Sequence, residues 1–507
     1  MALMAPAVEL RETHISLVFL TSDVVLKVKK PVNLGFLDFT ELATRKQLCE
    51  REVELNKRLA PDVYRGVVPI AVGADGRMQV GAAGPAVEWA VEMRRLADAD
   101  CAESRLQVGA LGFADVRRIA ERIALFHREC RCDDETGSFG DATVIERNVR
   151  ENFAQTKTSA LSFLSPRELA DIERFQLGFL ERQRDRFAER VQQRRIRDGH
   201  GDLRLEHCYL GEDHEISVID CIEFNDRFRY GDTASDIAFL AMDLAWHGRH
   251  DLSEALLAAY ARAANDFDLY GVVDFYESYR AFVRGKVSAL LQNDPGLSLE
   301  ARQRAAAQAR KYFLLAEACA REPAYPPAVY AVSGLIASGK STVADRLAEL
   351  AHAPVVDADR TRKSLAGVAA TAPMTDPAFG GHYSEQATDA VYAEVLRRAE
   401  LVLGSKRPVV IDASFRERHK REQARELAKR YGVPFLLIEC SVDRETIRAR
   451  LVDREKEPSV SDGRIGVLDA FAASFEPIEE LPSNEHLIVD TSRPIAETME
   501  RIRARIG

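Results

Sequence analysis

Short apolar runs alternate with longer helical segments in the second half of the chain. Uninterrupted apolar runs are typical of strands buried on both faces, and their alternation with helices favours a parallel sheet covered on both sides. The pattern therefore predicts an α/β unit that begins near residue 329. Its expected strands are Val329–Ser333, Pro354–Asp357, Pro408–Asp412, Pro434–Cys440 and His486–Asp490.

The first half of the chain has a different pattern. Ile15–Leu20 and Val24–Lys29 predict two short strands around a turn. From about residue 110 helical periodicity dominates, as in Ala114–Cys130 and Leu169–Val191. The segment Asp133–Gly140 predicts an exposed loop. The first half thus changes from strands to helices along its length.

A proline-rich stretch separates the two halves. Three prolines fall within Arg321–Pro327, directly after the helical segment Leu299–Arg321, and proline cannot continue a helix. A chain of 507 residues also exceeds one ordinary domain. We expect a first domain over 1–322, a linker over 323–328 and a second domain over 329–507.

The composition limits the classes of partner. The chain carries 70 Lys and Arg against 80 Asp and Glu, a net charge of −10, which argues against nucleic acid or an anionic membrane as partner. The eight cysteines are scattered and predict reduced thiols in a cytoplasmic protein. The N-terminus does not resemble a signal peptide, and no apolar run is long enough to span a membrane. The oligomeric state stays open.

The segment Gly334–Ser341 fits the pattern G-x-x-x-x-G-K-[ST] between an expected strand and an expected helix. Its backbone N–H groups and the helix N-terminus would bind the phosphates of ATP. Lys340 would contact the β- and γ-phosphates, and Ser341 would bind Mg²⁺. The alternative is a glycine turn in an unrelated α/β unit. The predicted nucleotide contacts are Gly334, Leu335, Ile336, Ala337, Ser338, Gly339, Lys340, Ser341 and Thr342.

Two acidic residues follow expected strands, Asp359 after the second and Asp412 after the third. Ligands of open α/β sheets lie at the carboxyl ends of the strands, so we expect both carboxylates near the phosphates, with Asp412 on Mg²⁺. This half resembles the P-loop kinases grouped around polynucleotide 5′-kinase and related small-molecule kinases, in which such an Asp is followed three residues later by an Arg. The resemblance implies that Asp359 accepts the acceptor's proton and that Arg362 steadies phosphate. The alternative is a surface ion pair.

Phosphoryl transfer also uses positive charge, often from a mobile lid. The arginine row Arg448–Arg454 resembles the lid side of such a kinase, and within it Arg450 and Arg454 are the candidate catalytic arginines. A solvated helix face is the alternative. The stretch Arg416–Arg421 mixes charges and predicts an exposed helix start. Residues 329–507 carry 26 Lys and Arg against 28 Asp and Glu, which favours a small hydroxyl-bearing acceptor over a polynucleotide.

The segments Asp198–Leu210 and Val218–Asn225 carry a second signal, His-Gly-Asp followed by an Ile-Asp strand end. They resemble the catalytic and metal-binding loops of aminoglycoside phosphotransferases and allied kinase-like enzymes. The resemblance implies that Asp202 is the base and that Asp220 binds Mg²⁺. Glu223 and Asp236 match the acidic positions that commonly follow in this family, and Glu223 is expected at the metal.

The same resemblance implies that Lys27 contacts ATP phosphates and that Glu52 is its ion-pair partner. Lys29 and Lys30 compete for the role of Lys27, and alternation places Lys27 and Lys29 on one face of the strand. His207 stands where the family has a metal-binding Asn, and His is a poor ligand for a hard cation. No glycine-rich loop precedes Lys27.

The whole arrangement resembles bacterial bifunctional proteins in which a kinase-like domain is followed by a P-loop ATP-binding domain. It implies an α+β protein-kinase-like domain, with a small β lobe and a helical lobe, and then an α/β P-loop NTPase domain with a parallel sheet. We expect a phosphotransferase that uses ATP and Mg²⁺ on a small hydroxyl-bearing acceptor. The alternative is an ATP-driven switch whose kinase-like half is a degenerate binding or regulatory module.

Overall fold

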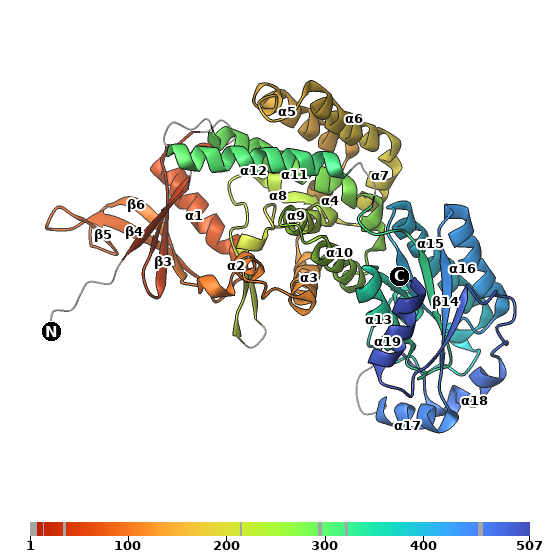
Figure 1. Cartoon of the computed structure of the whole chain (residues 1–507). Helices are drawn as coiled ribbons and strands as arrows, with labels where there is room; N and C mark the ends of the chain where they lie inside the picture. The colour runs from red at the N-terminus through yellow and green to blue at the C-terminus, as the bar shows by residue number, and fades with distance from the viewer. Residues whose placement is uncertain are drawn as a thin grey trace. The chain divides into compact units, whose positions relative to one another are not determined.

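The computed structural model describes residues 8–13, 15–33, 37–212, 215–292, 297–319, 323–454 and 460–506. The chain folds into two compact units (Figure 1), and neither is continuous in sequence. The first unit comprises Met1–Leu252 and Phe275–Cys319, and the second comprises Ser253–Asp274 and Ala320–Gly507.

The first unit begins with a β lobe. Among its described residues, six antiparallel strands form one sheet in the order β1-β2-β3-β6-β4-β5. Helix α1 (Leu42–Asn56) packs on this sheet, where Cys49 and Val53 meet Val91 and Met93. The two strands expected before residue 30 are confirmed. The strands are β1 (Glu9–Glu12), β2 (Ser16–Leu20), β3 (Val24–Lys29), β4 (Tyr64–Val72), β5 (Met78–Val80) and β6 (Ala86–Arg94).

A helical lobe completes the first unit. Its helices are α2 (Ala102–Gln107), α3 (Phe113–Glu129), α4 (Asp134–Ser138), α5 (Ala142–Ala160), α6 (Pro166–Arg182), α7 (Arg184–Gln192), α8 (Asp226–Arg229), α9 (Thr233–Trp246), α11 (Val273–Gln292) and α12 (Leu299–Ala318). Four short strands pair two by two between α7 and α9. They are β7 (Ile196–Asp198) with β10 (Tyr230–Asp232), and β8 (Cys208–Leu210) with β9 (Ile216–Val218).

Two predictions for this lobe are wrong. The segment expected as an exposed loop contains α4, because Asp133 accepts the backbone N–H of Thr136 and the Thr136 side chain is buried. The segment expected as one helix divides into α6 and α7 at Gln183, which leaves the helical region with φ −113° and ψ 21°.

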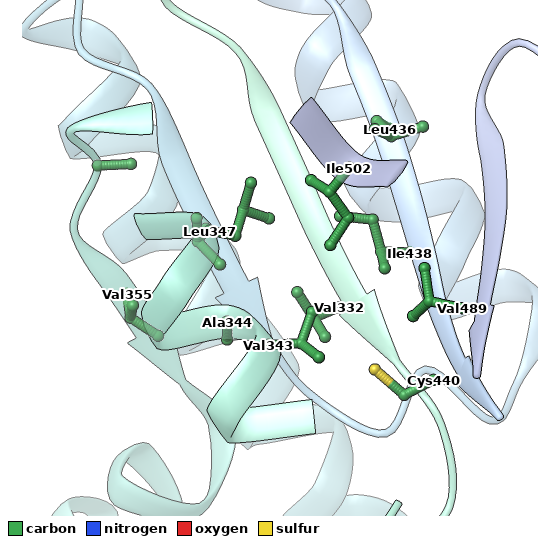
Figure 2. Packing of buried hydrophobic residues seen from close by; sticks show 12 residues of the cluster. Val332, Val343, Ala344, Leu347, Val355, Leu436, Ile438, Cys440, Val489 and Ile502 are labelled. Atoms are coloured by element: carbon green, nitrogen blue, oxygen red, sulfur yellow. The ribbon is translucent and has the colours of Figure 1, made fainter. Parts of the chain in front are cut away.

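The second unit is built on a parallel sheet in the order β12-β13-β11-β14-β15. Figure 2 shows one side of this sheet, where Val332 and Ile438 pack against Val343 and Leu347 of α13. The predicted α/β class and all five expected strands are confirmed. The strands are β11 (Val329–Ser333), β12 (Val355–Asp357), β13 (Val409–Asp412), β14 (Phe435–Ser441) and β15 (His486–Asp490).

The helices of the second unit cover both faces of the sheet, as expected for this class. They are α13 (Lys340–Ala351), α14 (Ala358–Leu365), α15 (Glu385–Gly404), α16 (Arg418–Tyr431), α17 (Arg444–Arg454), α18 (Ile465–Ala473) and α19 (Ile495–Ile506).

The segment 253–274 packs with the second unit although it precedes the proline-rich linker by about fifty residues. It holds most of α10 (His250–Ala263) and the short helix η4 (Phe267–Gly271). The guanidinium of Arg407 lies 2.7 Å from Glu254 and 2.8 Å from Asp274. The sequence-based boundary at residue 322 assigns this segment to the first domain, whereas its packing places it in the second unit.

The structure also bears on the expectations from composition. Within the described residues, no helix combines the length and apolar character needed to cross a membrane. All eight cysteines lie within the described residues, and none of them forms a disulfide there.

Candidate functional site

The loop between β11 and α13 has the backbone of a phosphate cradle. Gly334 has φ 143°, and a Cβ atom there would lie 2.6 Å from the carbonyl oxygen of Cys440. Gly339, the N-cap of α13, has φ 87°, and Ala337 between them is also left-handed at φ 56°. Glycine adopts such conformations without steric cost. The two glycines of the motif are therefore required by the backbone itself.

Two side chains of this loop face the cavity at the end of the sheet. Lys340 Nζ donates to the carbonyl oxygen of Leu335 at 2.7 Å, and the Ser341 hydroxyl hydrogen-bonds Asp412 at the end of β13. The structure thus brings Lys340, Ser341 and Asp412 together (all three line one pocket). Their roles toward ATP and Mg²⁺ stay predictions.

Three carboxylates meet at the carboxyl ends of β12 and β13. Burial, together with the neighbouring Asp357 carboxylate, raises the pKa of Asp412 to about 7, although Lys340 and Ser341 oppose this shift. Burial and Asp357 likewise raise the pKa of Asp359, against the influence of Arg362. Asp357 itself accepts the backbone N–H of Arg360 and caps α14. Concentrated negative charge of this kind favours a bound cation.

Beyond these carboxylates the pocket is lined by Arg362 of α14 and by Asp376, Pro377 and Tyr383 from the segment between α14 and α15. Arg362 is 8% exposed, donates to the carbonyl oxygen of His382 at 2.7 Å, and lies over the Tyr383 ring at 4.6 Å. Its burial disagrees with the alternative of a surface ion pair between Asp359 and Arg362. The Tyr383 hydroxyl in turn donates to Asp462 at 2.9 Å. Residues 376–383 lie between α14 and α15. The sequence of this segment has no periodicity that predicts where its side chains point.

Sequence analysis missed two pocket arginines, Arg416 and Arg464. Arg416 lines the pocket, and its guanidinium lies 4.7 Å from the Phe379 ring and 5.2 Å from the Phe471 ring. The expectation of an exposed helix start over Arg416–Arg421 is therefore wrong in part. Arg421 is fully buried and pairs with Glu480 at 2.5 Å. Charged residues of this stretch pair with acids far along the chain, as Lys420 does with Asp389 and Arg421 with Glu480. The order of residues in the sequence does not reveal such pairs.

The two predicted lid arginines lie on α17. Arg450 donates to the carbonyl oxygens of Thr491 at 2.6 Å and Ala337 at 3.3 Å, so it braces the phosphate loop against the end of β15. Arg454 ends α17, and its side chain lies outside the described part of the chain. A catalytic role for either arginine stays a prediction.

The donor set of the second unit suits Mg²⁺. This ion retains several waters and takes one or two carboxylates together with substrate phosphates, which matches Ser341 and Asp412 beside the phosphate loop. No group of three or more His, Cys, Asp or Glu side chains arranged for a metal occurs among the residues that the structure describes. A site completed by nucleotide phosphates agrees with both observations.

The first unit brings the predicted lysine and its acid together. Lys27 Nζ lies 2.9 Å from Glu52 and 2.5 Å from Asp220. Burial opposes the charge of Lys27, but Asp220 and Glu52 raise its pKa well above the usual range. Burial also opposes ionisation of Asp220, and Lys27 and His207 nevertheless hold its pKa below the usual range. Lys27 and Asp220 are therefore a charged pair.

A second lysine forms an unexpected parallel pair. Lys29 is 1% exposed, lies 2.7 Å from Glu52 and also pairs with Glu223. Lys27 and Lys29 both pair with the fully buried Glu52: Lys27 binds its Oε1 and Lys29 binds its Oε2. Glu223 has a raised pKa because burial outweighs Lys29. Both predicted metal ligands of this unit, Asp220 and Glu223, thus face an ammonium group.

His207 is a further difference from the metal site that the resemblance implies. Its Nδ1 donates to the carbonyl oxygen of Asp202 at 2.8 Å, and its Nε2 lies 3.6 Å from Asp220. The position of the family's metal-binding Asn is therefore filled by an imidazole that contacts the next acid. As arranged, the residues of the first unit do not fit a magnesium site.

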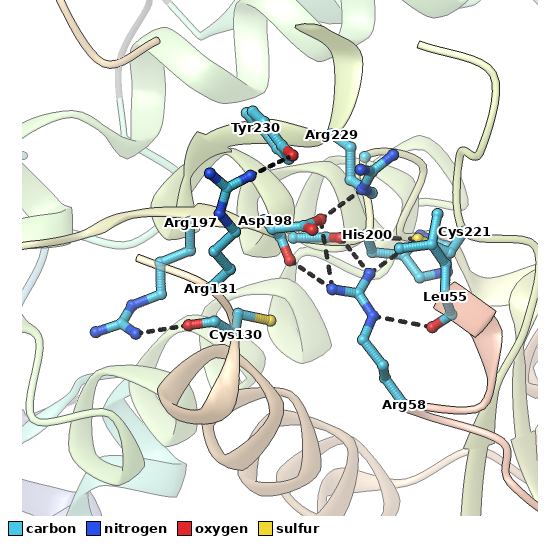
Figure 3. Close-up of polar contacts among 12 residues, drawn as sticks. Leu55, Arg58, Cys130, Arg131, Arg197, Asp198, His200, Cys221, Arg229 and Tyr230 are labelled. Atoms are coloured by element: carbon cyan, nitrogen blue, oxygen red, sulfur yellow. Dashed lines mark hydrogen bonds and ion pairs between the residues drawn. The ribbon is translucent and has the colours of Figure 1, made fainter. Parts of the chain in front are cut away.

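The loop that carries Asp202 is held by buried polar contacts. Figure 3 shows Arg58, which donates to the carbonyl oxygens of Asp198 and Gly199 at 2.9 and 3.0 Å. The Asp236 carboxylate accepts the backbone N–H of His200 at 2.6 Å, so it supports the loop and does not face a metal. Burial lowers the pKa of His200 to about 4, and its neutral ring serves structure.

Comparisons with known proteins cover both units. Residues 329–478 match a protein family described as an AAA domain. Over 452 residues the chain is 33% identical to uncharacterized proteins of Mycobacterium tuberculosis and Mycobacterium bovis, and the match covers 89% of this chain and 86% of each relative.

Two solved structures resemble parts of the chain. A choline/ethanolamine kinase family protein from Mesorhizobium loti is 14% identical with a TM-score of 0.35, covering 63% of this chain and 94% of that one. A gluconokinase from Sinorhizobium meliloti is 21% identical with a TM-score of 0.26, covering 36% of this chain and 93% of that one.

Proposed function

We propose that this chain, which belongs to the same family as these mycobacterial proteins, is an ATP-dependent phosphotransferase acting on a small hydroxyl-bearing acceptor. The P-loop pocket of the second unit carries the reaction. The observation that supports this most directly is the convergence of Lys340, Asp359 and Asp412 on one pocket.

The nucleotide end of the pocket is the phosphate loop. Its backbone N–H groups and the N-terminus of α13 bind phosphate oxygens, and Lys340 moves from the Leu335 carbonyl to the β- and γ-phosphates. Ser341 and Asp412 would hold Mg²⁺, which supplies charge neutralisation on the phosphates when bound. Formation of that site requires Asp412 to ionise, and a cation beside it lowers its pKa from about 7.

The acceptor end contains the base. Asp359 accepts the proton of the attacking hydroxyl, and its raised pKa makes its carboxylate a stronger base than an ordinary Asp. Arg362 and Arg416 line the same pocket and stabilise negative charge on the transferred group. The Arg416 guanidinium packs against two phenylalanine rings, which already fix its position. It therefore loses little conformational entropy when the substrate binds.

The proposal includes a second transfer site in the first unit, with Asp202 as its base. This part is supported by the position of Asp202 on the loop between β7 and β8, where it lines a cavity. A second candidate function is an ATP-driven switch, in which the first unit binds a ligand and the second hydrolyses nucleotide. The pairing of Asp220 and Glu223 with lysines favours that role for the first unit.

The phosphate's destination separates these functions. The full-length chain is incubated with ATP, Mg²⁺ and pools of sugars, sugar acids, polyols and nucleosides, and ADP and inorganic phosphate are measured together. An excess of ADP over phosphate means transfer to a hydroxyl, whereas equal amounts mean hydrolysis. Lys340→Ala is expected to lower ADP formation about a hundredfold or more, and the exposed Lys429→Ala serves as the matched control.

Two results would reject the proposal. One is ADP formation that is the same in Lys340→Ala and the parent protein, which would place the nucleotide chemistry elsewhere. The other is release of one phosphate for each ADP with every pool, which would support the switch. Asp202→Asn in the same assay reports whether the first unit contributes.

A further inference from the structure

The first unit contains a second cavity, which includes the predicted site residues Lys27, Asp202 and Asp220 and extends beyond them. It has a volume of about 1590 Å³ and extends from Lys27 in the β lobe to Leu291 near the end of α11. Its inner wall is formed by α5, α9 and α11, beyond Asp202 on the loop between β7 and β8. The side chains of this inner wall define what the cavity accepts.

Lys286 of α11 forms no ion pair with a carboxylate within the described part of the chain, although Glu151 is close enough to attract its charge. Its Nζ donates to the amide oxygens of Asn152 at 2.9 Å and Gln155 at 2.5 Å. The nearby Glu151 is instead bound by Arg227 at 2.5 Å. Burial lowers the pKa of Lys286, as expected for an ammonium group that lacks an ion-pair partner.

Two arginines add positive charge beside Asp202. Arg204 is 8% exposed and pairs with Glu206 through its terminal nitrogen, and Arg284 hydrogen-bonds Tyr312. The Nε of each arginine is nevertheless buried without a hydrogen-bond partner. Burial opposes ionisation of Asp202, yet Arg204, His207 and Arg284 hold its pKa below the usual range. Buried donors of this kind are costly unless a ligand satisfies them.

We propose that this inner cavity binds a small organic anion, a hydroxyl-bearing carboxylate or phosphate monoester, with its charged group between Lys286 and Arg284. The hydroxyl end would lie toward Asp202. Phe239, Val283 and Val287 line the same cavity and would contact the carbon skeleton. The inference concerns binding, and it holds whether or not the first unit transfers phosphate.

The charges also indicate what the cavity rejects. A polycation or a choline-like quaternary amine would place further positive charge beside Lys286, Arg284 and Arg204, which is unfavourable in a buried site. The composition of the whole chain, with its net charge of −10, conceals this local excess of positive charge.

The two tryptophans of the chain offer a readout confined to the first unit, because they are Trp89 and Trp246. Trp246 stacks on Tyr312 with ring centroids 5.1 Å apart, and Arg284 lies over the same tyrosine at 5.8 Å. A ligand that engages Arg284 should therefore change Trp246 fluorescence. Phosphate binding at the P-loop of the second unit lies outside this readout.

The experiment titrates full-length Trp89→Phe protein with 3-phosphoglycerate, glycerol and choline, with potassium chloride at matched ionic strength. We expect a saturable fluorescence change with 3-phosphoglycerate alone. Lys286→Met should weaken its apparent affinity at least about tenfold, and so should Arg284→Gln. The matched control is Lys157→Met, an exposed lysine of α5 outside the cavity. Thermal unfolding verifies that each variant is folded.

Three outcomes would overturn the inference. The first is a change with 3-phosphoglycerate no larger than that with potassium chloride. The second is binding of choline as tight as that of the anion. The third is binding that Lys286→Met and Arg284→Gln leave unaltered while both variants are folded, since the anion would then occupy another place.

Discussion

Asp357 and Asp412 are direct neighbours in adjacent parallel strands, paired in register at the ends of β12 and β13. Two carboxylates so close cannot both ionise cheaply in a buried site, and the pKa of Asp412 is accordingly raised to about 7. The sheet itself therefore creates a place where a divalent cation relieves electrostatic repulsion. Such stored repulsion is common at functional sites.

We predict that Asp412→Asn stabilises the second unit in the absence of Mg²⁺. A carboxyl group whose pKa is higher in the folded state than in the unfolded state favours folding at low pH, and that contribution is lost as pH rises through about 7. The gain from Asn should be larger at pH 8 than at pH 6, by on the order of 1 kcal/mol. Urea unfolding at both pH values measures it. Equal gains would contradict the shift, and the exposed Asp469→Asn is the control.

Asp359→Asn should lower kcat by a factor on the order of 10² to 10⁴ and leave ATP affinity almost unchanged. The parent enzyme should lose activity as pH falls, because protonated Asp359 cannot accept a proton, and this limb should lie above the ordinary Asp range since its pKa is raised. Steady-state kinetics from pH 5 to 9 test both points. A variant with the parent's kcat would exclude Asp359 as the base.

Gly334→Ala should abolish nucleotide binding. The new Cβ would lie 2.6 Å from the Cys440 carbonyl oxygen, at a φ of 143° that alanine rarely adopts. The control is Gly466→Ala on α18, where nothing lies within 4 Å of an added Cβ. Binding of a non-hydrolysable ATP analogue, measured by calorimetry, distinguishes the two variants. Equal affinities would mean that this loop does not bind phosphate.

Lys29→Met should destabilise the first unit by about 3–5 kcal/mol, because it leaves Glu52 and Glu223 buried beside a single remaining lysine. Adding Glu223→Gln should restore part of the loss. Denaturant unfolding of the single and double variants gives the coupling between the two positions. The exposed Lys57→Met is the control, and strictly additive effects would argue against the buried pair.

His207→Asn tests whether the first unit has lost a metal site. The substitution removes the contact between Nε2 and Asp220 and supplies an amide oxygen, a ligand that Mg²⁺ prefers to imidazole. In the Lys340→Ala background we expect tighter Mg²⁺-dependent ATP binding than with His207, measured by calorimetry. Asp220→Ala should remove whatever metal dependence is found. Unchanged binding would mean that Lys27 and Lys29 alone exclude the metal.

The strands of the second unit could be predicted almost to the residue because each is a buried apolar run, three of them with a proline at or beside the start, as in Pro408 before β13. The failures have local causes. Helix α4 depends on the capping contact between Asp133 and Thr136 within a polar, glycine-containing segment, and the break at Gln183 has no proline or glycine to signal it.

Site residues that follow a motif could be placed from sequence, as Lys340 and Asp412 were. Residues that depend on partners far along the chain could not. Arg416 is held between rings at positions 379 and 471, and Lys29 meets an acid 194 residues away. No periodicity links such positions, because each contact follows from the complete fold.

The segment 253–274 has a consequence for biosynthesis. Emerging from the ribosome with the first half of the chain, it must wait for residues 320–507 before its packing surface exists. Conversely, a fragment cut at the proline-rich linker would lack Glu254 and Asp274, and Arg407, only 8% exposed in the intact chain, would lose both carboxylates. The two units are interleaved in sequence, so a simple end-to-end fusion of independent modules does not describe this molecule.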